Sequence, residues 1–149
     1  MNTLNLEGAL KYSEENRIEE WVHLLLQHED NNIPFSEGLK LEKRRFFNPR
    51  LIDLTHFERC CGPESHLKYV IDETNFEKRV EGMIKSLNEG WKMPPLIINF
   101  SKGKFELNDG NHRFEALVRS QVNEYYVIIW TTGSEDEQLY ESTYMFGLD

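Results

Sequence analysis

The sequence predicts an α/β domain in which helices pack on a small mixed sheet of about four or five strands. An amphipathic helix is expected at 75–89, where apolar residues recur at helical spacing. Buried strands are expected at 95–100 and 125–131, where apolar residues follow one another almost without interruption. Between them, an alternating strand at 104–108 leads through a tight turn into a second helix at 111–120.

The helix at 75–89 has a start signal and a stop signal. Thr74 and Glu77 have the spacing of a capping box, in which each side chain satisfies a backbone N–H at the helix start. Gly90 is typical of a residue that ends a helix. Pro94 and Pro95 then favour an extended chain that enters the first buried strand.

The first part of the chain carries weaker signals. Residues 1–12 show no firm pattern and are expected to form a loosely docked arm. Ser13 fits the N-cap of a helix that runs to about His28. The segment 35–47 fits neither the helical nor the strand period, and a short strand is expected at 51–54.

The length of 149 residues favours one domain with a conventional hydrophobic core. We divide the chain into an N-terminal helical extension over 1–50, a core over 51–133 and an acidic tail over 134–149. A short helix is expected in the tail near 135–140. The sequence contains no long apolar run, so neither a membrane partner nor a signal peptide is expected, and a cytoplasmic location follows.

Charge bears on the choice of partner. The formal net charge is -9, which disfavours DNA or RNA through long-range repulsion. One segment, 37–50, has five bases and two acids next to aromatic residues, and such a segment could follow a nucleic-acid strand. No helix-turn-helix pattern accompanies it.

The two cysteines, Cys60 and Cys61, are adjacent, and a disulfide between neighbours is strained and rare. We interpret them as partly buried, reduced thiols. His56 and His66 place four possible zinc ligands in one short window, but the usual Cys-x-x-Cys pair is missing. No metal site is therefore predicted there.

The turn after the hairpin is the predicted functional centre. Gly110 is expected to take a positive φ and to start the helix. The free backbone N–H groups of Asn111, His112 and Arg113 would then lie at the positive end of the helix dipole, beside an imidazole and a guanidinium. This arrangement predicts a phosphate or carboxylate site. The alternative is that Asp109 only caps the helix and that His112 and Arg113 are ordinary side chains of a surface turn.

A longer pattern surrounds this turn. It consists of Pro94-Pro95-Leu-Ile-Ile-Asn-Phe-Ser-Lys-Gly, a short strand, and Asp109-Gly-Asn-His-Arg-Phe-Glu-Ala116. The pattern resembles the ParB/sulfiredoxin-like superfamily, best from about Asn75 to Trp130. The resemblance implies a ParB/sulfiredoxin-like fold in which His112 and Arg113 hold nucleotide phosphates.

The branches of that superfamily imply different chemistry. Sulfiredoxins carry a nucleophilic cysteine directly before the His-Arg pair, and Asn111 stands there, so a sulfinic acid reductase is not expected. Kinases acting on free serine use an upstream glutamate as base, which makes Glu64 the first candidate, with a solvated turn glutamate as the alternative. In that reading Lys102 would add a phosphate contact and Asp109 would help to hold magnesium. Partition proteins carry a DNA-binding bundle after this domain, for which a chain ending at Asp149 is expected to leave no room.

The sequence therefore predicts a nucleotide-binding protein, with ATP or CTP and magnesium, that performs hydrolysis or phosphoryl transfer to a small-molecule acceptor. The alternative is a non-catalytic interaction module or a DNA-associated regulatory module with the same fold. Arg113 is expected to contribute little to the core. The candidate catalytic residues are Glu64 and Asp109, and the candidate nucleotide-binding residues are Lys102, Gly110, Asn111, His112 and Arg113.

Overall fold

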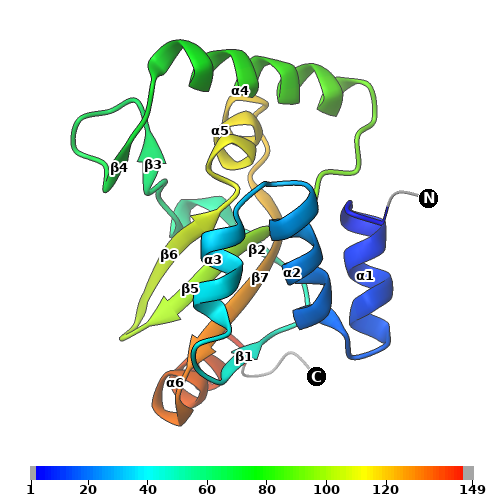
Figure 1. The fold of residues 1–149 in the computed structure, drawn as a ribbon, viewed down its shortest axis with the longest axis vertical. Coiled ribbons are helices and arrows are strands. Elements are labelled where there is room, and N and C mark those ends of the chain that lie inside the picture. The colour runs from blue at the N-terminus through cyan, green and yellow to red at the C-terminus, as the bar shows by residue number, and fades with distance from the viewer. Residues whose placement is uncertain (1–2, 146–149) are drawn as a thin grey trace.

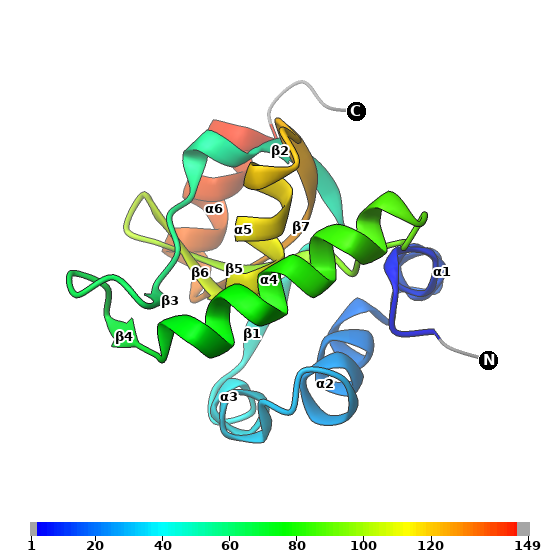
Figure 2. The ribbon, with the colours of Figure 1, turned by 90° about the horizontal axis from the view of Figure 1, so that it is seen from above.

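Helices lie on both faces of a mixed sheet (Figures 1 and 2). The computed structural model describes residues 3–145. Within these residues no helix combines the length and apolar composition needed to cross a membrane. The helices are α1 (Leu6–Glu14), α2 (Ile18–His28), α3 (Ile33–Leu39), α4 (Glu73–Asn88), α5 (Asn111–Arg119) and α6 (Ser134–Tyr144), with a 3-10 turn, η1 (Leu54–His56). The strands are β1 (Arg44–Phe46), β2 (Arg50–Asp53), β3 (Cys61–Gly62), β4 (Tyr69–Val70), β5 (Leu96–Ser101), β6 (Lys104–Asp109) and β7 (Glu124–Thr132).

Strand β7 is the centre of the sheet. The order is β1-β7-β5-β6, and β2 also pairs with β7, so that five strands of the described chain share one sheet. β7 runs antiparallel to β1 and β2 and parallel to β5, which forms an antiparallel hairpin with β6. β3 and β4 form a separate parallel pair. The predicted mixed sheet and its three main strands are thus confirmed.

Each face of the sheet has its own apolar core, which explains the uninterrupted apolar runs in β5 and β7. Ile97 and Ile128 pack on one face with side chains of α1, α2 and α3. Ile98 and Ile129 pack on the other face with side chains of α4, α5 and α6. Figure 2 shows α1–α3 on one side of the sheet and α5 and α6 on the other. Strands buried on both faces have no polar side to alternate with.

The N-terminal extension differs from the prediction. Residues 6–12, expected to belong to a loose arm, form most of α1, which packs on α2 and buries Ala9 completely. Asn5 caps this helix, because its side chain accepts a hydrogen bond of 2.9 Å from the Gly8 N–H. Ser13 therefore lies in the last turn of α1, and the prediction that it is the N-cap of the helix ending at His28 is wrong.

The ambiguous segment 35–47 contains the end of a helix and a strand. It covers most of α3, a connection and β1, so neither period could describe the whole segment. The short strand predicted at 51–54 is found as β2. The helix predicted in the acidic tail is α6, while residues 146–149 lie outside the described residues.

Helix α4 is confirmed, but its predicted capping box is wrong. The N-cap is Asp72, whose Oδ2 accepts a hydrogen bond of 2.8 Å from the Asn75 N–H. The helix starts two residues earlier than the box would place it, so Thr74 lies inside the first turn. Glu77 instead pairs with Arg119 of α5 at 2.6 Å. Asp72 and Thr74 are both suitable N-cap residues, and in the structure the helix begins at the first of them.

Candidate functional site

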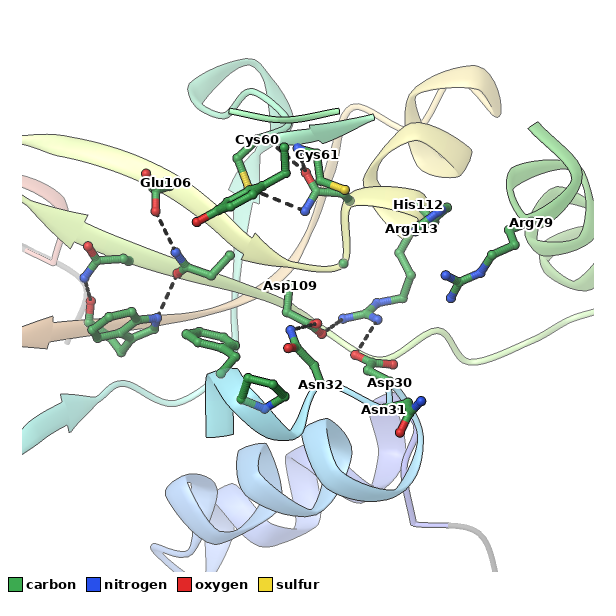
Figure 3. Close-up of a pocket in the computed structure, with 18 of the residues that line it drawn as sticks. Asp30, Asn31, Asn32, Cys60, Cys61, Arg79, Glu106, Asp109, His112 and Arg113 are labelled. Atoms are coloured by element: carbon green, nitrogen blue, oxygen red, sulfur yellow. Dashed lines mark hydrogen bonds and ion pairs between the residues drawn. The ribbon is translucent and has the colours of Figure 1, made fainter. Parts of the chain in front are cut away.

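A pocket of about 710 Å³ lies where the end of β6 and the start of α5 meet the α2–α3 loop (Figure 3). Its other walls come from α4 and from the segment that carries Cys60 and Cys61. Residues 109–113 all line it. The structure thus places the predicted turn in a pocket, with a wall that comes from the N-terminal extension.

Gly110 starts α5 with a φ of 102°, as predicted. A Cβ at this position would lie 2.9 Å from Arg113 Nη2 and 2.9 Å from Leu96 Cδ2, so both the conformation and the space favour glycine. No side chain caps α5. The first-turn N–H groups of Asn111 and His112, like that of Arg113, have no acceptor among residues 3–145. These donors are available to an anion.

Arg113 does not have the role predicted for it. The side chain is only 4% exposed, and Nη1 lies 3.0 Å from Asp30 Oδ2. Nη2 donates to the Pro95 carbonyl oxygen at 3.0 Å and lies 3.5 Å from Asp109 Oδ2. Because these groups engage both Nη atoms, Arg113 holds the pocket together instead of lying free for a phosphate. The expectation that it contributes little to the core is wrong.

Asp109 is buried beside Arg113 and Asp30. It is 7% exposed, and Oδ1 accepts a hydrogen bond of 3.2 Å from Asn32 Nδ2. Burial, reinforced by the neighbouring Asp30 carboxyl, raises the pKa of Asp109 well above its usual range. Burial also disfavours the charge on Asp30, but the attraction of Arg113 outweighs it and lowers the pKa of Asp30. The pKa values of the two carboxyls therefore shift in opposite directions, so that Asp30 is the anion and Asp109 retains its proton more readily.

The ring of His112 is half-buried against Phe76, with 4.9 Å between the ring centroids. Burial, together with the positive charges of Arg79 and Arg113, lowers the pKa of His112 to about 4. The imidazole is therefore neutral near pH 7. It can offer a phosphate a hydrogen bond but not a charge.

The sequence interpretation missed Arg79 of α4. Its exposed side chain lines the pocket and makes no hydrogen bond or ion pair with residues 3–145. The signal that could have found it is helical spacing, because Arg79 is three residues from Phe76 and four from Met83. Phe76 packs on His112, and Met83 lines the pocket. An arginine between them is held beside the same site.

Asn111 supports the cysteine segment. Its Oδ1 accepts hydrogen bonds from the backbone N–H groups of Cys60 at 2.9 Å and Cys61 at 3.1 Å. The Cys60 thiol donates to the Leu107 carbonyl oxygen at 2.8 Å. Burial raises the pKa of both thiols, so they are protonated and weakly nucleophilic. The prediction of partly buried free thiols is confirmed, although the sequence did not place them beside the turn.

Two predicted site residues lie elsewhere. Glu64 is bound to Arg59, with 3.2 Å between Oε1 and Nη1, and this hydrogen bond lowers the pKa of Glu64. It lines a separate hollow of about 270 Å³. Lys102 lies in the β5–β6 turn, where its N–H donates to Asp136 Oδ1 at 3.0 Å. Neither side chain lines the pocket, so we remove both from the candidate site.

The expected magnesium ligand does not fit its surroundings. Asp109 faces Arg113, and its carboxyl favours the protonated form. Over the described part of the chain, no three His, Cys, Asp or Glu side chains are grouped as a metal site. Asp109 is better suited to carry a proton than to hold a cation.

No protein-family model and no curated protein matches the chain. Its fold is similar to three solved structures, each with a TM-score of 0.42. Sulfiredoxin from Arabidopsis thaliana is 17% identical, over 63% of this chain and 98% of that chain. A Pnob8-like ParB-N domain is 19% identical, over 70% of this chain and 37% of that one.

The third structure is the C-terminally truncated chromosome-partitioning protein ParB from Caulobacter crescentus, complexed with CTP-gamma-S. It is 13% identical, over 66% of this chain and 54% of that one. The chain therefore spans only part of the two ParB structures. Sulfiredoxin and ParB are also the proteins that the sequence pattern resembles. What the pocket binds has to be inferred from its own residues.

Proposed function

We propose that the pocket binds a nucleoside triphosphate, ATP or CTP, with its phosphates at the start of α5. The observation that carries this proposal is the meeting of two separate anion-binding features in one pocket. The first is the α5 start, where Asn111 and His112 present free N–H groups. The second is Arg79, a guanidinium without a partner in the described chain. Helix dipole and guanidinium act on the same anion.

The size and composition of the pocket support a ligand of this class. A volume of about 710 Å³ lies within the range of small-molecule sites. Beyond the phosphate end, Trp130 and Phe35 offer aromatic surface and Asn99 offers an amide. No three His, Cys, Asp or Glu side chains within residues 3–145 form a metal site, so magnesium would enter with the phosphates and neutralise part of their charge.

We further propose that the bound nucleotide undergoes phosphoryl transfer or hydrolysis with Asp109 as the proton carrier. Asp109 lines the pocket, and burial raises the pKa of its carboxyl. A carboxyl that titrates above its usual range is suited to general acid or base catalysis. In this proposal Asp109 takes the role that the sequence had suggested for Glu64, which is bound to Arg59 outside the pocket.

The alternative is nucleotide binding without catalysis, as in a regulatory module. It is favoured by the capture of Arg113 between Asp30 and Asp109, which leaves fewer positive groups for a transition state. A nucleic-acid partner has less support. In the basic segment 37–50, Arg44 donates to Thr132 and to two carbonyl oxygens, and Arg45 lies over Phe47.

A thermal-shift screen with ATP, CTP and GTP, each with magnesium, tests the proposal. A dissociation constant of about 100 μM would raise the unfolding free energy by about 1.4 kcal/mol at a ligand concentration of about 1 mM. No shift with any nucleotide would contradict nucleotide binding. A shift without release of phosphate or phosphorylated product would favour the regulatory module. If both occur, Asp109→Asn should lower turnover more than binding.

A further inference from the structure

A row of three side chains crosses the sheet at one end of the pocket. Asn99 of β5 pairs with Trp130 of β7 on one side and with Glu106 of β6 on the other. Directly paired residues on neighbouring strands lie on the same face of a sheet. This face carries α2 and α3, because Trp130 packs in the same core as their side chains. All three residues line the pocket.

Glu106 lies at the opposite end of the pocket from Arg79 (Figure 3). A phosphate group would be attracted to Arg79 and repelled by Glu106. The charges therefore fix the direction of a bound nucleotide, with its phosphates at α5 and its other end at the row of side chains.

The Glu106 carboxylate is held in place by a chain of hydrogen bonds. Asn108 Nδ2 donates to Glu106 Oε1 at 3.0 Å, and Asn108 Oδ1 accepts from Trp130 Nε1 at 2.9 Å. Trp130 is 8% exposed, so the chain ends on a well-buried anchor. Lys68 Nζ lies 3.6 Å from Oε2, but this ion pair is exposed and weak. The Glu106 side chain is itself 47% exposed, so the hydrogen bond from Asn108 holds the carboxylate at the rim of the pocket.

The chemistry of Glu106 defines what it can contact. An ionised carboxylate only accepts hydrogen bonds, and its two oxygens offer about four acceptor positions. Asn108 and Lys68 use part of that capacity. The rest suits a group that presents two donors together, as the adjacent hydroxyls of a ribose do. Carboxylates contact the ribose 2′-hydroxyl in the same way in dinucleotide-binding folds.

We propose that Glu106 is a specificity-determining residue that accepts hydrogen bonds from the ribose hydroxyls, so that the pocket prefers ribonucleotides to 2′-deoxyribonucleotides. Asn108 is its positioning residue. The inference rests on the proposed nucleotide function, and it adds the part of the ligand that is recognised at the end remote from the phosphates.

Isothermal titration with ATP, CTP, their 2′-deoxy counterparts and inorganic tripolyphosphate tests this proposal. The unaltered protein should bind the ribonucleotides about tenfold more tightly than the deoxyribonucleotides, the effect of one hydrogen bond to a charged group. Glu106→Ala, which removes both acceptor oxygens, should bind both kinds equally and should bind tripolyphosphate at least as tightly as the unaltered protein, because a repelling charge is lost. Asn108→Ala should reduce the preference, and Lys104→Ala, a control on the same strand but outside the pocket, should keep it.

Several outcomes would overturn the inference. Equal binding of ribo and deoxy forms by the unaltered protein, or a preference that survives Glu106→Ala, would reject it and leave nucleotide binding intact. If Glu106→Ala weakened both forms equally, the carboxylate would contact another part of the ligand, and the inference would fail. If no nucleotide bound, the proposed function would fail as well. Unfolding curves would confirm that each variant is folded.

Discussion

The Nη1 atom of Arg113 lies 3.0 Å from Oδ2 of Asp30, which is 83 residues away in the sequence. This ion pair joins the start of α5 to the α2–α3 loop. It brings the N-terminal extension against the predicted turn, where Asn32 also contacts Asp109 at 3.2 Å. The extension is therefore a wall of the pocket.

Replacing Arg113 by Ala should destabilise the protein by about 3–5 kcal/mol, the usual effect of breaking a buried ion pair. The substitution removes the partner of Asp30 and the donor to the Pro95 carbonyl oxygen. Urea unfolding of the variant measures the loss. Arg119→Ala is the control, because Arg119 pairs with Glu77 on the surface and should cost at most about 1 kcal/mol. Equal, small effects of both substitutions would show that Arg113 is not a structural residue.

His112 should titrate with a pKa of about 4 in an NMR experiment, against about 6.5 for an unfolded histidine. Because the unfolded state binds the proton first, His112 should lower stability as the pH falls from about 6.5 to about 4, and should have no such effect above that window. Arg79→Ala should raise the pKa of His112, since Arg79 is one cause of its depression. Lys78→Ala, one residue away, should change it less. A normal histidine pKa in the unaltered protein would contradict the buried setting.

Two glycines allow a matched test of the turn. Gly110→Ala should destabilise the protein by about 1–3 kcal/mol, because an alanine would be forced to positive φ, and its Cβ would also meet Arg113 and Leu96. Gly82 lies on the exposed side of α4, where nothing lies within 4 Å of an added Cβ. Gly82→Ala should therefore stabilise by about 0.5–1 kcal/mol. Thermal unfolding of both variants distinguishes a special turn from a general glycine effect.

Asp72→Ala should cost about 1 kcal/mol of stability, since Asp72 caps α4 through the Asn75 N–H. Thr74→Ala should change stability by less than about 0.5 kcal/mol, because Thr74 is exposed and lies inside the helix. Chemical denaturation measures both losses. A larger loss of stability for Thr74→Ala than for Asp72→Ala would support the capping box that the sequence suggested.

The sequence predicted those features that depend on neighbouring residues. The apolar runs of β5 and β7, the stripe of α4 and the positive φ of Gly110 all arise locally, and all are found. The burial of Arg113 was not predictable in this way, because it depends on Asp30, which belongs to a distant loop. Helix α1 was missed because it is only nine residues long and depends on packing against α2.

The candidate site was predicted in its place but not in its roles. Asn111, His112 and Arg113 line the pocket, yet Asn111 supports the cysteine segment, and Arg113 is bound by two carboxyls. Arg79, whose guanidinium is exposed in the pocket, belongs to another helix. Its place in the site depends on the packing of α4 against α5, which the sequence does not show. Motif residues identified the turn, whereas tertiary contacts decided what each side chain can do.

Isothermal titration of Arg79→Ala with ATP and CTP in the presence of magnesium tests the central claim most directly. The guanidinium is exposed and has no partner within residues 3–145, so its removal should leave the unfolding free energy nearly unchanged. Loss of a charge-assisted contact should weaken nucleotide binding by about 1.5–3 kcal/mol, that is, about tenfold or more. Lys78→Ala, on the same helix but outside the pocket, should bind as the unaltered protein does. Unchanged affinity in a folded Arg79→Ala variant would contradict a phosphate site at the start of α5.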